Sequence, residues 1–189
     1  MLRAVFWGIA VWVLAAISGV ANAQSPYPFV DKGFEVPEEL VTEDFRVRML
    51  SMHDVIKDYD AVMASAEQLK ENFPRWGGWP DGLTVEADLL DLAWHQKEFV
   101  RRTSFTYTVV SLDDSTVLGC IYIYPTRKTG YDADITLWAR ESVIGSPADI
   151  ALDEAVRAWV EAEWQFENPA YPGRDMSWEE WDELPTSKR

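Results

Sequence analysis

A turn between an apparent strand and an apparent helix carries the residues best suited to chemistry. It runs from Arg140 to Gly145, and Ser146 follows as the predicted N-cap of a long amphipathic helix. A glycine-containing turn that leads into a helix N-terminus can hold a pyrophosphate, because backbone N–H groups and the helix dipole favour negative charge there. Val143 weakens this expectation because a β-branched residue resists positive φ, and Glu141 adds negative charge. The turn is therefore a candidate anion site in which Val143 and Glu141 are unfavourable for binding.

Other catalytic motifs are not evident in the chain. Cys120 is the single cysteine, so no disulfide can form within the chain, and neither His53 nor His95 is tied to it by a recognisable motif. Two isolated histidines and one cysteine disfavour a zinc site, and the dispersed carboxylates form no calcium loop. The sequence also lacks a Gly-x-Ser-x-Gly elbow and a Walker loop. We expect no metal.

The N-terminus predicts export. Arg3 gives a positive start, residues 4–20 are almost wholly apolar, and residues 21–23 (Ala-Asn-Ala) form a small-x-small cleavage motif. We interpret residues 1–23 as a signal peptide, with an uncleaved membrane anchor as the alternative. The mature protein would be periplasmic or secreted, with no membrane contact after cleavage.

The net negative charge of the chain limits the classes of partner that it can bind. The formal net charge is −15 at pH 7, which argues against nucleic acid and anionic membranes because both require clustered Lys and Arg. Acidity permits a small-molecule amine or another cationic ligand. Trp76, Trp79 and Trp94 lie near a Gly-Gly turn, where they either form a stacking platform, for example for a carbohydrate, or complete the core. The oligomeric state stays open.

Periodicity and capping signals predict one α/β domain. Residues 24–43 are interpreted as an extended leader with little structure, and residues 44–189 as the domain. The expected order is strand 45–50, a helix from 55 to before 73, a helix from 85 to 102, strands 104–112, 116–124 and 132–140, a helix after 146, a short strand within 166–171 and a small helix from 177. Tight turns between the three central strands predict an antiparallel meander, and for the whole domain we expect a mixed, mostly antiparallel sheet flanked by helices.

This order of elements resembles the N-acetyltransferase superfamily related to the Gcn5 enzymes, which has the acyl-CoA N-acyltransferase fold. The resemblance spans residues 45–171 and includes the phrases Leu118–Pro125, Thr136–Arg140 and Ala155–Trp159. It implies a parallel contact between strand 133–140 and strand 166–171. The two strands would splay apart to admit the pantetheine arm of an acyl coenzyme A.

The resemblance also implies roles for particular residues. In the family pattern Gln/Arg-x-x-Gly-x-Gly/Ala, Arg140 and the last glycine match, whereas Val143 replaces the middle glycine. With acetyl-CoA as co-substrate, the implied cofactor-binding residues are Trp138, Ala139, Arg140, Gly145 and Ser146. Glu141 is the candidate base, or else a solvated turn residue. Tyr171 is the candidate acid, although Pro172-Gly173 follows it where the family continues with a helix.

Two functions follow as hypotheses. The first is an acyltransferase that moves an acyl group from acyl-CoA to an amine. The second is an exported, non-catalytic binding protein that retains the acetyltransferase-like fold, which would agree better with export because acyl-CoA is a cytoplasmic metabolite. An open groove and free turn amides would favour the first, and a filled groove would favour the second.

Overall fold

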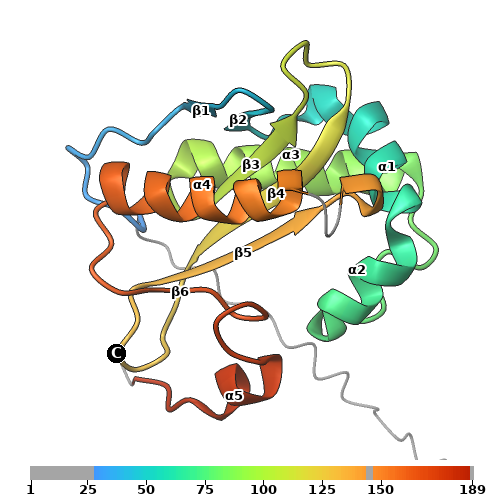
Figure 1. Cartoon of the computed structure of the whole chain (residues 1–189). Coiled ribbons are helices and arrows are strands. Elements are labelled where there is room, and N and C mark those ends of the chain that lie inside the picture. Colours follow the sequence, from blue (N-terminus) through green and yellow to red (C-terminus); the bar gives the residue numbers. More distant parts are fainter. Residues whose placement is uncertain (1–27, 144–146, 188–189) are drawn as a thin grey trace, which may run out of the picture.

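The computed structural model describes residues 28–143 and 147–187 of the chain (Figure 1). The predicted signal peptide, Gly145 and Ser146 lie outside these residues. One six-stranded sheet runs in sequence order, formed by β1 (Glu39–Val41), β2 (Arg46–Met49), β3 (Phe105–Val110), β4 (Val117–Pro125), β5 (Ala133–Ala139) and β6 (Pro169–Ala170). All neighbours pair antiparallel except β5 and β6, which pair parallel. The expected mixed, mostly antiparallel sheet is confirmed.

Helices cover both faces of the sheet, with α4 on one side and α1 and α3 on the other (Figure 1). Their bounds are α1 Val55–Ala64, α2 Ala66–Asn72, α3 Val85–Arg101, α4 Pro147–Glu163 and α5 Trp178–Glu183. Short 3₁₀ turns occupy residues 52–54, 74–76 and 141–143. None of the helices within the described ranges is long and apolar enough to span a bilayer.

Local hydrogen bonds start three of the helical segments as predicted. Ser51 and Ser177 each form a capping box, at the 3₁₀ turn before α1 and at α5. The Thr84 side chain accepts a hydrogen bond from the backbone of Ala87 at the start of α3. The expected single helix over 55–72 is instead two helices, broken at Ser65, whose hydroxyl donates to the carbonyl of Ala61.

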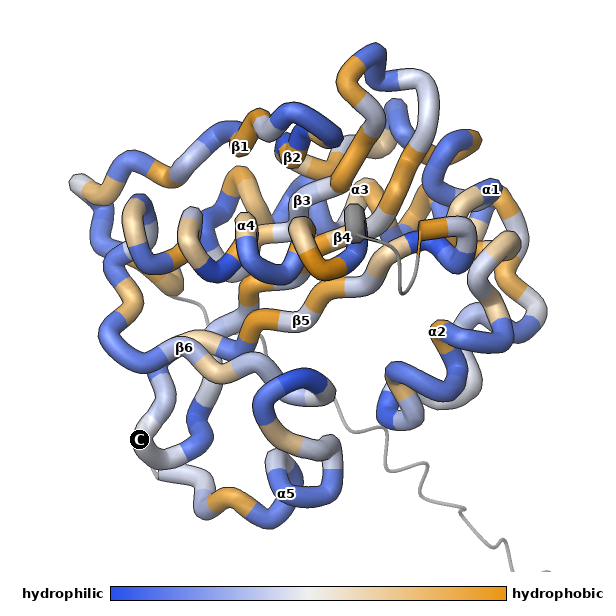
Figure 2. Tube along the Cα trace, in the orientation of Figure 1, coloured by the Kyte–Doolittle hydropathy of each residue, from blue (hydrophilic) through white to orange (hydrophobic). Residues whose placement is uncertain are grey.

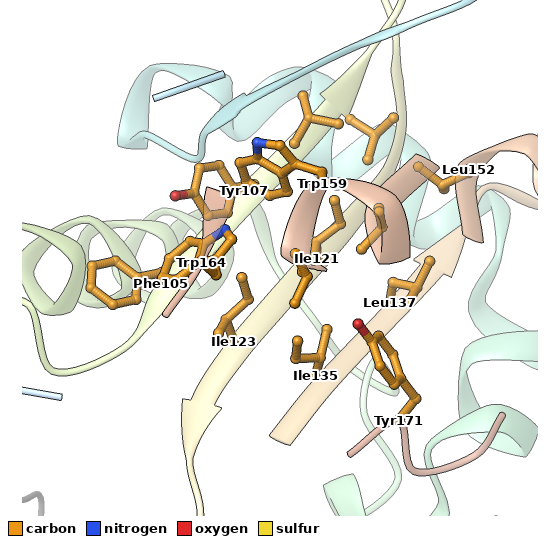
Figure 3. Packing of buried hydrophobic residues seen from close by; sticks show 14 of the residues in the cluster. Phe105, Tyr107, Ile121, Ile123, Ile135, Leu137, Leu152, Trp159, Trp164 and Tyr171 are labelled. Atoms are coloured by element: carbon orange, nitrogen blue, oxygen red, sulfur yellow. The ribbon is translucent and has the colours of Figure 1, made fainter. Parts of the chain in front are cut away.

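Alternation along the strands divides the core into two layers. Ile121 and Ile123 of β4 point toward α4 and pack in an apolar cluster with Trp159 (Figure 3). Cys120 and Tyr122 point to the opposite face, under α1 and α2. Hydrophobic residues follow β5 in Figure 2, whereas the outlying helix α2 is largely hydrophilic.

The described part of the predicted leader packs onto the domain. Val30 is buried, and the Phe29 ring stacks on Phe166 with the centroids 5.2 Å apart. The hydroxyl of Tyr107 donates to the carbonyl of Pro37 at 2.7 Å, and residues 39–41 form the edge strand β1. Phe29, Phe34 and Val36 thus pack against the apolar cluster under α4.

Candidate functional site

The strands β5 and β6 part soon after they meet. Their ladder contains two pairs, Ala133 with Pro169 and Asp134 with Ala170. The rest of β5, up to Ala139, has no strand partner on that side among the described residues. The parallel contact and the splay implied by the sequence are thus both present.

A groove of about 400 Å³ lies at this free edge of β5. Its walls are the end of α2 at residues 71–73, the side chain of Leu137, and the tail segment that follows β6. The tail is held against α2 because the indole N–H of Trp178 donates to the carbonyl of Asn72 at 2.7 Å. Gly173, at φ +80°, passes so close to Trp178 that a Cβ atom would lie 3.0 Å from the indole nitrogen. The tail therefore forms one wall of the groove.

Tyr171 occupies the gap on the α4 side. Its ring is buried, and Figure 3 shows its hydroxyl directed toward Ile135 and Leu137 of β5. The guanidinium of Arg157, on α4, lies 4.0 Å from the ring centroid. Burial raises the pKa of Tyr171 to about 12, so the hydroxyl keeps its proton at neutral pH.

Ion pairs join α4 to the tail on the same side. Arg157 contacts Asp175 at 2.8 Å, and Arg174 contacts Asp153 at 3.3 Å. Arg157 also pairs with Asp153 within α4. Together with the Tyr171 ring, these pairs hold the tail against α4 on this face of the sheet.

The first half of the predicted phosphate turn uses its amides internally. The backbone N–H of Arg140 donates to Leu118 at 2.7 Å, and that of Glu141 donates to the hydroxyl of Ser65 at 3.0 Å. The N–H of Val143 donates to the Arg140 carbonyl. The Arg140 guanidinium pairs with Asp60 of α1 at 2.8 Å, and the Glu141 side chain is exposed. An anion at this turn would therefore find the amides of Glu141 and Val143 already bonded within the protein.

The other predicted site residues do not meet in one place. Trp138 and Ala139 are buried on opposite faces of β5, and the Trp138 indole donates to the hydroxyl of Tyr122 at 3.2 Å. Glu141 lies beyond the end of β5, at the start of the 3₁₀ turn 141–143 and four residues from Leu137. Because the ring of Tyr171 lies beside Leu137 (Figure 3), the two candidate catalytic residues are separated along the strand.

A second cavity, of about 250 Å³, lies on the α3 side of β4. We call it the aromatic pocket, and its lining residues are Trp76, Trp79, Asp91, Trp94, His95, Tyr122 and Tyr124. The Trp76 ring meets Trp79 at an interplanar angle of 72° and Tyr122 at 81°, with centroids 5.2 and 5.4 Å apart. Trp76 therefore contacts both of the other rings edge to face.

An imidazole and a carboxylate line the same pocket. The His95 Nε2 lies 3.5 Å from the Asp91 carboxylate, and its Nδ1 lies 2.9 Å from the Thr106 hydroxyl. Sequence reasoning missed this pair. The spacing of Asp88, Asp91 and His95 in α3 was the available signal, because positions i, i+3 and i+7 share one helix face.

One pair of stacked rings separates the groove from the aromatic pocket. Phe73 lines the groove and Trp76 lines the pocket, and their rings stack with centroids 3.9 Å apart and planes 6° apart. The two cavities are therefore neighbours. In the part of the chain that the structure describes, no cluster of three or more His, Cys, Asp or Glu side chains is arranged to hold a metal ion.

Comparison with known proteins identifies the fold. No family model matches the chain, and no curated protein does. Among solved structures, RimJ from Mycobacterium smegmatis in complex with CoA-disulfide aligns with a TM-score of 0.54 at 14% identity, over 67% of this chain and 61% of that one. The chain has the fold of the Gcn5-related N-acetyltransferases.

Two further acetyltransferase structures agree. RimL, a ribosomal L7/L12 alpha-N-protein acetyltransferase in complex with coenzyme A, aligns with a TM-score of 0.53 at 16% identity, over 65% of this chain and 67% of that one. An acetyl transferase from Salmonella typhimurium that modifies the N-terminal serine of L7/L12 aligns at 0.51 and 13% identity, over 65% of this chain and 66% of that one. At these identities the likeness is one of fold, and this chain spans about two thirds or less of each neighbour.

Proposed function

We propose that this acetyltransferase-like chain transfers an acyl group, in the simplest case acetyl, from acyl-CoA to an amine. The observation that carries the proposal is the splay of β5 from β6, with its groove separated from the aromatic pocket by the Phe73–Trp76 stack. A thioester in the groove and an amine in the pocket would lie on either side of these two rings. Direct transfer brings the amine nitrogen against the thioester carbonyl, so the rings would have to part, or one substrate would have to reach past them.

One residue of the aromatic pocket and one residue next to the groove are candidates for the proton transfers of this reaction. The amine nitrogen must lose a proton before its lone pair attacks the thioester carbonyl, where the N–C bond forms and the C–S bond breaks. His95, held between Asp91 and Thr106, is the base that lies in the pocket. Tyr171 remains protonated at neutral pH and is the candidate acid for the departing thiolate. Glu141 is less well placed for the same amine, because it follows the far end of β5.

The donor site fits acyl-CoA only in part. The groove has room for the chain of a thioester, but the amides of Glu141 and Val143 are already bonded within the protein. Gly145, Ser146 and the start of α4 would have to bind the pyrophosphate, and Arg140 would help once released from Asp60. An exported protein would also need an acyl donor outside the cytoplasm.

A second function has its own supporting observation. Tyr171 and the Arg157–Asp175 pair hold the tail against α4, which favours a binding protein that retains the fold without transferring an acyl group. In this case the aromatic pocket alone would be functional.

Calorimetric titration of the protein with acetyl-CoA separates the two functions. If the chain is a transferase, acetyl-CoA should release or absorb saturable heat and should raise the unfolding temperature. The absence of both effects at millimolar acetyl-CoA would exclude the transferase. Tyr171→Phe should keep acetyl-CoA binding and slow transfer by about 100-fold or more, because it removes only the hydroxyl. Tyr131→Phe is the matched control and should leave both unchanged. Equal rates in the two variants would exclude Tyr171 as the acid.

A further inference from the structure

We propose that the aromatic pocket binds an organic ammonium group, such as an N-methylated or aliphatic ammonium. That this ammonium group is the acyl acceptor rests on the proposed transfer reaction. That the pocket binds an ammonium group depends only on the residues of the pocket. It names a ligand class that the fold does not specify.

The rings of the pocket face several directions. Trp76 meets Trp79 and Tyr122 at steep angles, and Tyr124 lies parallel to Tyr122 at 7° with the centroids 6.2 Å apart. One face of Trp76 is covered by Phe73, so the other lining rings supply most of the π faces that a small group could contact. An ammonium within about 6 Å of ring centroids is attracted by the negative ring faces, and the attraction grows when water is excluded.

The charged groups around the pocket favour a cation. None of the residues that line it is Lys or Arg, although the ammonium of Lys97 lies 5.8 Å from the centroid of the Trp94 ring, and Asp91 places a half-exposed carboxylate at the edge of the pocket. Asp88 lies behind Asp91 on α3, where burial and the charge of Asp91 raise its pKa to about 6. A cation in the pocket would lower the energy of both carboxylates, whereas an anion would be repelled.

The aromatic pocket is small and offers few free polar groups. A cavity of about 250 Å³ is smaller than the usual range for drug-sized ligands, so it suits a compact head group. Two of its polar groups are already engaged, since His95 Nδ1 contacts Thr106 and the Tyr122 hydroxyl accepts from Trp138. A neutral sugar would find few hydrogen-bond partners here, which disfavours the carbohydrate platform.

A matched pair of probes tests the charge requirement directly. Choline and 3,3-dimethylbutan-1-ol have the same shape, but only choline is a cation. Titration followed by tryptophan fluorescence and calorimetry should show choline binding at least about tenfold more tightly. Equal affinity, binding of neither probe, or tighter binding of glucose would overturn the proposal.

Matched variants locate the binding. Trp94→Leu should weaken choline binding about tenfold or more and Trp94→Phe by less, because phenylalanine keeps a π face. Asp91→Asn should weaken it several-fold, whereas Asp44→Asn, an equal loss of charge on the exposed β1–β2 turn, should not. Near-ultraviolet circular dichroism confirms that each variant is folded. Unchanged affinity in Asp91→Asn and in Trp94→Leu would place the ligand elsewhere and overturn the proposal.

The probes also keep this inference separate from the transfer reaction. Choline has no N–H to acylate, so its binding reports on the pocket and not on chemistry. Choline binding without acetyl-CoA binding would support the pocket and contradict the transferase. Acetyl-CoA binding without choline binding would support the transferase and contradict the proposed ammonium pocket.

Discussion

At the scale of single residues, the side of the sheet that α1 and α3 cover contains buried aspartate side chains. Asp58 of α1 is 4% exposed and accepts a hydrogen bond from the Cys120 thiol, with sulfur and oxygen 3.5 Å apart. Burial, with the nearby charge of Asp88, raises the pKa of Asp58 to about 7. The same burial and the Asp58 charge raise the pKa of Cys120, so this thiol is no activated nucleophile.

Asp58→Asn should change how stability depends on pH. A carboxyl whose pKa is higher in the folded state stabilises the fold fully below pH 4, and this contribution is lost as pH rises toward 7. The loss is on the order of 4 kcal/mol for a shift of this size. The unfolding free energy of the variant, relative to wild type, should therefore increase between pH 4 and pH 8.

Urea unfolding at several pH values measures this difference. Asp44→Asn is the control, because Asp44 is exposed and should give the same difference from wild type at every pH. A difference for Asp58→Asn that does not change with pH would contradict the raised pKa.

At the scale of elements, the register between β4 and β5 positions both cavities. Gly119 lies opposite Ala139, and Tyr122 lies opposite Thr136, which sends Tyr122 into the aromatic pocket and leaves Leu137 at the groove. The close approach of the strands at Gly119 leaves no room for a side chain, because a Cβ atom would overlap the carbonyl oxygen of Trp138.

Gly119→Ala should therefore destabilise the protein by about 3 kcal/mol or more, through separation of β4 from β5. Gly33→Ala is the matched control, because a Cβ atom at Gly33 would meet nothing within 4 Å. Thermal unfolding of the two variants makes the comparison. A Gly119→Ala variant as stable as Gly33→Ala would show that the strands can move apart there at little cost.

At the scale of the whole molecule, one sheet separates two unlike layers. The α4 side is an apolar core sealed by Trp159, Trp164 and Tyr171, and the α3 side contains acids, His95 and the aromatic pocket. The chain as a whole carries a formal charge of −15, which would draw cations toward the pocket at low salt.

Export is the prediction that belongs to the whole chain. When the full sequence is expressed in a bacterial host, the purified protein should begin at Gln24, because residues 1–23 have the three parts of a signal peptide. Mass spectrometry of the periplasmic fraction measures this. Ala23→Phe should block cleavage, since the site requires a small residue. Cytoplasmic protein that still begins at Met1 would contradict export.

Local interactions explain what could be predicted from the sequence by itself. The caps at Ser51, Thr84 and Ser177 and the alternation of the central strands depend on residues a few positions apart, so these helix starts and the antiparallel central strands were predicted correctly. Strand β1 and the break at Ser65 were not predicted. The parallel contact of β5 with β6 and the splay came from the family resemblance.

Only the tertiary structure decided what the site contains. The aromatic pocket draws on residues 76–79, on α3 and on β4, and the groove needs the tail of the chain to reach the end of α2. Each of these contacts joins segments far apart in the sequence, so no local pattern could reveal it. The turn at Arg140 was the best local candidate, yet its amides of Glu141 and Val143 are bonded within the fold. A cavity exists only where separate elements pack, and packing is a property of the whole fold.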